Sequence, residues 1–109
     1  MEKLKVLVVD DDAQLCSSAA ASLTEIGVHA ECALDGPSAI SMVERRHQKR
    51  RDYHVVLLDW QMPGMDGIET IRRIRSEVGD STPIVLLTAY DWHEIEEEAR
   101  AAGVSAFVS

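Results

Sequence analysis

Residues 55–67 read Val-Val-Leu-Leu-Asp-Trp-Gln-Met-Pro-Gly-Met-Asp-Gly, and this stretch decides the fold. Four apolar residues in a row lead to one acid, Asp59, and then to a segment that contains Pro63, Gly64 and Gly67. An apolar run without alternation is typical of a strand that is covered on both faces, as in a parallel sheet between helices. An acid at the carboxyl end of such a strand lies where open α/β sheets bind their ligands. We therefore expect Asp59 to be the reactive group.

Similar patterns on both sides of this stretch predict alternating strands and helices. The order strand, helix, strand, continued to a fifth strand, is typical of a doubly wound parallel sheet with helices on both faces. In the first helix, the apolar residues Leu15, Ala19, Leu23 and Ile26 recur at helical spacing and predict the buried face. Strands are expected at 4–9, 28–33, 55–58, 83–88 and 105–108, and helices at 13–26, from 37 onward, at 68–78 and at 91–102.

The composition of the chain excludes several classes of function. Its 109 residues suffice for one domain, and apolar runs of four or five residues are too short to span a membrane. The amino terminus does not resemble a signal peptide, and Cys16 and Cys32 lack a metal or redox spacing, so we expect a cytoplasmic protein with free thiols. A net charge of −8 disfavours binding to nucleic acid. We interpret the basic run 45–51 as a solvated helix end that complements the helix dipole.

Acids and a hydroxyl gather at the carboxyl ends of the predicted strands. Asp10, Asp11 and Asp12 follow the first strand, Asp59 ends the third, and Thr88 ends the fourth. Two carboxylates about 5 Å apart repel each other by roughly 3 kcal/mol at an effective dielectric constant near 20, so such a cluster requires a cation or bound protons. Oxygen ligands without His or Cys are those that Mg²⁺ prefers. Asp12 alone is interpreted as the N-cap of the first helix.

Four segments resemble the receiver domains of two-component response regulators. Residues 6–12, Val-Leu-Val-Val-Asp-Asp-Asp, resemble the first strand of that family with its acidic pair. Residues 57–67 look like the phosphoacceptor strand and its loop, 86–89 (Leu-Leu-Thr-Ala) like the strand with the switch hydroxyl, and 102–107 like the approach to strand five. The resemblance covers the whole chain. It implies a flavodoxin-like, five-stranded parallel sheet with the strand order 2-1-3-4-5, within one receiver domain at 1–109.

The resemblance also implies how the phosphoryl group is handled. Asp59 would accept it from a phosphohistidine on a histidine kinase or a histidine phosphotransfer domain, and the domain would then act as a conformational switch. Thr88 would donate a hydrogen bond to a phosphoryl oxygen, and Phe107 would be the aromatic residue that changes rotamer. The domain would catalyse its own phosphorylation, and autodephosphorylation would be a further enzymatic step open to it. Residues 88–92 and 33–36 look like those of receivers fused to hybrid sensor kinases.

The Mg²⁺ site that the resemblance implies has four contributors. Asp11 and Asp59 would bind the ion directly, Asp10 would bind through water or more weakly, and Gln61 would offer its backbone carbonyl. Gln61 also bears on a rival interpretation, a phosphatase-type hydrolase, because such enzymes carry a second acid two residues after the nucleophile, where this chain has Gln61. The other alternative is a pseudo-receiver, an interaction module that uses the fold without being phosphorylated.

The sequence departs from the family pattern at its carboxyl end. The lysine that the family carries just beyond strand five has no counterpart, because Ser109 lies one residue before that position, and the fifth helix is missing. We interpret the chain as a receiver domain truncated before the expected lysine. The expected consequences are weakened phosphotransfer and an uncovered apolar patch beside the first helix, through which copies would self-associate.

Overall fold

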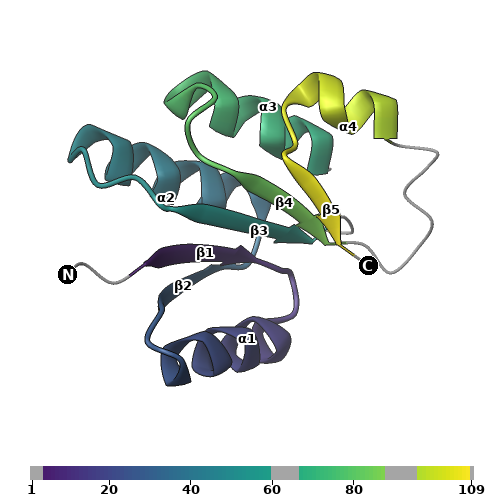
Figure 1. Ribbon diagram of the computed structural model, residues 1–109. Helices are drawn as coiled ribbons and strands as arrows, with labels where there is room; N and C mark the ends of the chain where they lie inside the picture. Colours follow the sequence, from purple (N-terminus) through teal and green to yellow (C-terminus); the bar gives the residue numbers. More distant parts are fainter. Residues whose placement is uncertain (1–3, 60–66, 88–95, 109) are drawn as a thin grey trace.

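Five short parallel strands form one sheet in the order β2-β1-β3-β4-β5 in the computed structural model, which describes residues 4–59, 67–87 and 96–108 (Figure 1). The expected alternation of strands and helices and the expected strand order are confirmed. The strands are β1 (Lys5–Val9), β2 (His29–Ala33), β3 (Val55–Asp59), β4 (Ile84–Leu87) and β5 (Ala106–Val108), and the helices are α1 (Ala13–Glu25), α2 (Gly36–Gln48), α3 (Gly67–Val78) and α4 (Glu96–Ala102).

The main core lies between the sheet and the helices α2, α3 and α4, which cover the same face (Figure 1). Alternate residues of the central strands point into it, as the two-residue period of a strand requires. Helix α3 contributes the largest helical share, because its apolar residues recur at every third or fourth position. The buried members include Leu7, Val9, Val56, Leu58, Ile84 and Leu86 from the strands and Val43, Ile71, Ile74 and Ala99 from the helices.

The opposite face of the sheet is covered by α1 alone among the described helices (Figure 1). Helix α1 packs against β1 and β2, so Val55 and Leu57 of β3 and Val85 and Leu87 of β4 are only half-buried. The prediction that β3 is buried on both faces was therefore wrong for one face. The apolar run shows that both faces of the strand can be buried. How much of each face is buried depends on the helices that cover it.

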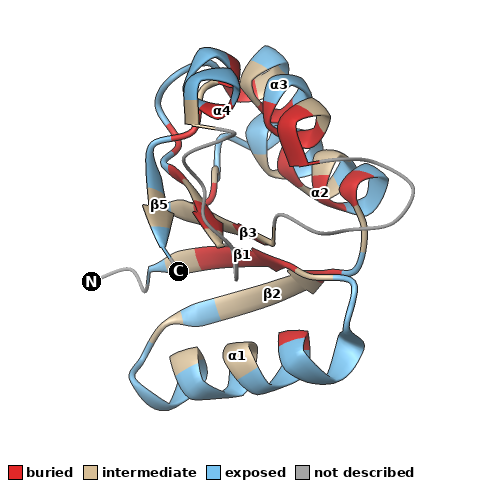
Figure 2. Cartoon of the chain, turned by 90° about the vertical axis from the view of Figure 1, so that its right-hand side faces the viewer, coloured by how far each residue is buried: buried red, intermediate tan, exposed pale blue. Residues whose placement is uncertain are grey.

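The predicted buried face of α1 was wrong at two of its four positions. Leu15 is 59% exposed and Ile26 is 75% exposed, whereas Ala19 and Leu23 pack against the sheet, together with the fully buried Cys16. Most of α1 has the colour of exposed residues in Figure 2. The helix buries the face that contains Cys16, because the small thiol side chain fits against β1. Leu15 and Ile26 are exposed apolar side chains of this helix. The uncovered apolar patch expected beside the helix, and self-association through it, stay predictions.

Both cysteines are free thiols, as expected. The thiol of Cys16 donates to the carbonyl oxygen of Val8 at 3.4 Å. The thiol of Cys32 donates to the backbone carbonyl oxygen of Cys16 at 3.1 Å. Burial, reinforced by the neighbouring Cys32, raises the pKa of Cys16 to about 12. Cys16 is therefore a protonated, unreactive packing group at neutral pH.

Aspartates at both N-caps set where α1 and α2 begin. A carboxylate oxygen of Asp12 accepts hydrogen bonds from the backbone N–H groups of Gln14 and Leu15 at 2.9 and 3.1 Å, which confirms its interpretation as a cap. Asp35 accepts from the N–H of Ser38 at 2.7 Å in the same way. That backbone hydrogen bond lowers the pKa of Asp35.

Helix α2 ends in a left-handed turn at Arg50, whose φ is 55°. The N–H of Arg50 donates to the carbonyl oxygen of His47 at 3.0 Å, and the N–H of Arg51 donates to that of Arg46 at 2.9 Å. These two bonds form a Schellman motif, which reverses the chain toward β3. Glycine is usual at this position because a Cβ atom strains the left-handed conformation, so Arg50 carries strain.

Replacing Arg50 by glycine should therefore stabilise the fold by about 0.5–1 kcal/mol, since relief of the left-handed strain outweighs the added flexibility of the unfolded chain. Urea unfolding at equilibrium measures the change. Gly79, with φ of 70° and open space around an added Cβ, offers the reverse substitution. Gly79→Ala should destabilise by about 1 kcal/mol. Loss of stability in Arg50→Gly would contradict the strain.

Arg75 ties the end of α3 to the amino ends of β4 and β5. Its guanidinium donates to the carbonyl oxygen of Gly103 at 2.8 and 2.9 Å, to that of Thr82 at 2.6 Å and to that of Gly79 at 3.0 Å. It also donates to the hydroxyl of Ser105 at 3.3 Å. One partly buried cation therefore satisfies three carbonyl groups from two connecting segments, α3–β4 and α4–β5.

Replacing Arg75 by methionine should destabilise the fold by about 2–4 kcal/mol, because partly buried carbonyl groups lose charged donors all at once. Arg72→Met on the same helix is the matched control. Arg72 is exposed and, among the residues that the structure describes, pairs only with Glu69, at 4.0 Å, so its loss should change the free energy of unfolding by about 0.5 kcal/mol or less. Equal effects of the two substitutions in urea unfolding would show that Arg75 has no special part.

Candidate functional site

The pairing of the strands brings Asp10 and Asp59 to the same level at the carboxyl edge of the sheet. Val9 of β1 lies opposite Leu58 of β3, so the next residue of each chain is an aspartate. One carboxylate oxygen from each of Asp10, Asp11 and Asp59 lies within 4.8 Å of the other two. The convergence that the sequence predicted for these three acids is thus present in the structure.

The three consecutive aspartates after β1 have different surroundings. The N–H of Asp10 continues the sheet ladder to the carbonyl oxygen of Ala33 at 3.1 Å, and its carboxylate accepts the N–H of Asp12 at 2.9 Å. Asp12 turns toward the start of α1 and caps it. Asp11 is exposed, whereas Asp10 and Asp59 are half-buried. The Asp10–Asp12 hydrogen bond was not foreseen, although an acid two residues before a cap is the sequence signal for such a turn.

This arrangement of acids fits a hard divalent cation. Each pair of carboxylates repels by roughly 3 kcal/mol at an effective dielectric constant near 20. Oxygen ligands around Mg²⁺ lie about 2.1 Å from the ion, so opposite ligands are about 4.2 Å apart. The separation of up to 4.8 Å among the three oxygens is close to this spacing. Asp10, Asp11 and Asp59 could therefore hold the ion, while the other proposed ligand, Gln61, and the proposed switch residue Thr88 lie outside the described residues.

Phe107 lies in β5 directly opposite Leu86 of β4, one row below the level of Asp59. Its ring is half-buried and packs against the main core. The guanidinium of Arg100, on α4, lies 5.3 Å from the centre of the ring, within the range of a cation–π contact. Sequence reasoning did not single out Arg100, because nothing in the local pattern indicates which ring a helical arginine will cover.

The family model described as "Response regulator receiver domain" matches residues 6–109. The chain belongs to the response regulator receiver domains. Among its relatives, the response regulator MprA of Mycobacterium leprae (strain TN) is 41% identical over 103 residues, which cover 94% of this receiver domain and 41% of that protein. Probable histidine kinase 2 of Oryza sativa subsp. indica is 35% identical over 114 aligned positions, which cover 94% of the receiver domain and 11% of the kinase.

A solved structure with the same fold is the receiver domain of the histidine kinase CKI1 from Arabidopsis thaliana, complexed with Mg²⁺ and BeF₃⁻. It is 29% identical to this receiver domain, with a TM-score of 0.82, and the match covers 97% of this chain and 80% of that one. The receiver domain spans less than half the length of either curated relative named above. It is a module of two-component signalling. Within the described residues, none of its helices could cross a bilayer.

Neutralising Asp11 should stabilise the receiver domain in the absence of divalent ions, because one of the three repelling carboxylates loses its charge. In EDTA, Asp11→Asn should raise the midpoint of urea unfolding, and added salt should shrink the gain. Asp12→Asn is the matched control, since asparagine caps a helix as well as aspartate does. The control should give no gain, and an equal gain in both variants would mean that only the net charge matters.

Proposed function

We propose that Asp59 accepts a phosphoryl group from a phosphohistidine of a histidine kinase or a histidine phosphotransfer domain, with Mg²⁺, and that the receiver domain thereby acts as a conformational switch in a phosphorelay. The observation that carries the proposal is the approach of Asp10, Asp11 and Asp59 to within 4.8 Å at the carboxyl edge of the sheet. Repulsion among the three carboxylates lowers the stability of the fold, so their clustering indicates a functional site.

The proposed transfer is an in-line displacement at phosphorus. A carboxylate oxygen of Asp59 forms the new O–P bond while the N–P bond of the phosphohistidine breaks, and the released imidazole nitrogen takes up a proton from solvent. Asp59 is half-buried at the edge of the sheet, so a partner's histidine can approach it while the strand keeps its direction fixed. The half-buried carboxylate is thus both accessible and oriented.

The proposed ligands of Mg²⁺ are the carboxylates of Asp10, Asp11 and Asp59 and the backbone carbonyl of Gln61. The bound ion would neutralise charge on the phosphoryl oxygens. The hydrogen bond that Asp10 accepts from the N–H of Asp12 helps to fix the orientation of its carboxylate. The CKI1 receiver domain, which has the same fold, is complexed with Mg²⁺ and BeF₃⁻, and this supports the assignment.

The proposed switch consists of Thr88, which follows β4 directly in the sequence, and Phe107. A phosphoryl group adds about two negative charges and three acceptor oxygens, so Thr88 would donate a hydrogen bond to it. Phe107 would then change rotamer. The Phe107 ring packs beside Arg100, so rotation of the ring would break the cation–π contact and move the guanidinium.

The setting of the receiver domain is part of the same proposal. Its relatives include both a response regulator and a histidine kinase, so it would work either before an output domain or within a hybrid kinase. We place it in the cytoplasm, where phosphohistidine donors of this kind act, without direct contact with a membrane. Its charge of −8 argues against nucleic-acid binding by this domain.

The test is to incubate the receiver domain with acetyl phosphate and Mg²⁺ and to measure the intact mass. We expect the mass gain of one phosphoryl group, which EDTA and the Asp59→Asn substitution should each abolish. Asp11→Asn should slow the reaction by about tenfold or more, because it removes a metal ligand, whereas Asp12→Asn should react at nearly the normal rate. No adduct at Asp59 would favour a pseudo-receiver, and rapid turnover of small phosphate esters would favour a hydrolase.

A further inference from the structure

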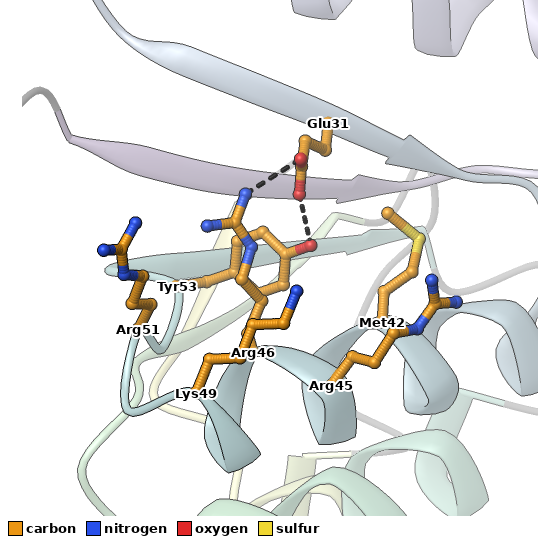
Figure 3. A pocket seen from close by; sticks show the side chains of 7 residues that line it. All are labelled: Glu31, Met42, Arg45, Arg46, Lys49, Arg51 and Tyr53. Carbon is orange, nitrogen blue, oxygen red and sulfur yellow. Dashed lines mark hydrogen bonds and ion pairs between the residues drawn. The ribbon is translucent and has the colours of Figure 1, made fainter.

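A cavity of about 370 Å³ lies beside the edge strand β2, at the carboxyl end of α2 (Figure 3). None of its lining residues is an aspartate of the cluster. Helix α2 together with its C-cap residue Lys49 provides most of its lining, and β2 and the segment before β3 provide the rest (Figure 3). The polar lining residues are Glu31, Arg45, Arg46, Lys49, Arg51 and Tyr53. Its volume lies at the lower end of the range of about 300–1,000 Å³ that is usual for pockets that bind small molecules.

The Schellman motif at the end of α2 builds this basic cavity. Arg45 and Lys49 are four residues apart, so they lie on one side of the helix. The left-handed turn at Arg50 then reverses the chain, and this reversal brings Arg51 and Tyr53 back to the same cavity. The strained turn therefore adds a cation that the helix alone could not supply.

One wall of the cavity is fixed by a small network of interactions. The guanidinium of Arg46 donates to a carboxylate oxygen of Glu31 at 2.8 Å and lies 5.1 Å from the centre of the Tyr53 ring. The hydroxyl of Tyr53 donates to the other oxygen of Glu31 (Figure 3). Tyr53 is only 4% exposed, and its burial together with the bond to Glu31 raises its pKa to about 12. Burial raises the pKa of Glu31, but hydrogen bonds from Tyr53 and Arg46 outweigh burial and lower it overall.

The other three cations of the lining have no acidic partner among the described residues. Glu31 is the only acid that lines the cavity, and Arg46 already neutralises it. Arg45, Lys49 and Arg51 are exposed, and none of them takes part in an ion pair within the described part of the chain. The helix dipole accounts for cations in the last turn of α2, but not for Arg51, which lies beyond the helix.

We propose that this cavity binds a small organic phosphate, with Arg45, Lys49 and Arg51 donating to the phosphate oxygens. A phosphate ester carries about two negative charges and three acceptor oxygens at neutral pH, which matches three donors without partners better than a single carboxylate does. Guanidinium groups bind phosphate through two parallel hydrogen bonds. Met42 adds an apolar contact for the organic part of the ligand. The fixed Arg46–Glu31–Tyr53 wall keeps the cavity open.

Titration of the isotope-labelled chain with ADP and with inorganic pyrophosphate, followed by NMR of the backbone amides, tests this site. EDTA is present, so that the aspartate cluster repels the anions. We expect saturable shifts at residues 45–53 and at Glu31, and weaker binding as salt is raised. Pyrophosphate separates the phosphate chemistry from the contribution of the organic part. Absence of shifts at millimolar ADP, or shifts spread evenly over the surface, would overturn the proposal.

Two double variants that each remove two positive charges distinguish specific binding in the cavity from nonspecific electrostatic attraction of the anion. Lys49→Gln with Arg51→Gln should weaken ADP binding by about tenfold, because two charge-assisted hydrogen bonds are lost. Arg72→Gln with Arg73→Gln removes two exposed cations that belong to α3 and pair with Glu69, and should change the affinity by less than about twofold. Equal losses would sink the proposal, and so would citrate binding as tightly as pyrophosphate.

Discussion

The parallel pairing of β1 with β3 is the contact on which the site depends. Val9 lies opposite Leu58, and both are buried in the main core, so the two strands leave the sheet at one level with an aspartate next in each. A slip by one residue would turn every side chain of β3 to the other face and expose Leu58. Burial of Leu58 contributes about 2 kcal/mol, which is comparable with the repulsion within one pair of carboxylates. The core therefore fixes the direction of Asp59 against the charges that gather around it.

Helix α2 separates two regions of opposite charge. Its first residue follows Asp35, just beyond the carboxyl end of β2, and its last turn carries Arg45 and Arg46 beside the basic cavity. Thirteen helical residues span about 20 Å, which is roughly twice the screening length at physiological salt. An anion in the cavity and a phosphoryl group on Asp59 would thus interact weakly through space. The two sites can be filled independently, unless α2 itself moves.

Much of the fold and the aspartate cluster could be predicted from the sequence, because both depend on local patterns. Apolar runs gave the strands, and the carboxyl ends of parallel strands must share an edge, so Asp10, Asp11 and Asp59 were expected to meet. The buried face of α1 was predicted wrongly because Leu15 and Cys16 both fit the helical period. Only the space available against β1 determines that Cys16, and not Leu15, is buried. The basic cavity was missed for a similar reason. Its Schellman turn at Arg50 lacks the usual glycine, so no local signal marked the chain reversal.

The hydrogen bonds of Arg75 hold one end of the β4–β5 region in place. All of them reach segments that precede or connect the strands, at Gly79, Thr82, Gly103 and Ser105. Phe107 is the central residue of β5, one row below the level of Asp59. A rearrangement that begins near Asp59 would therefore reach Phe107 before it reached the segments that the guanidinium holds. Arg75 therefore joins the amino ends of both strands and the residue directly after α4 into one connected region, away from the carboxyl edge where the aspartates lie.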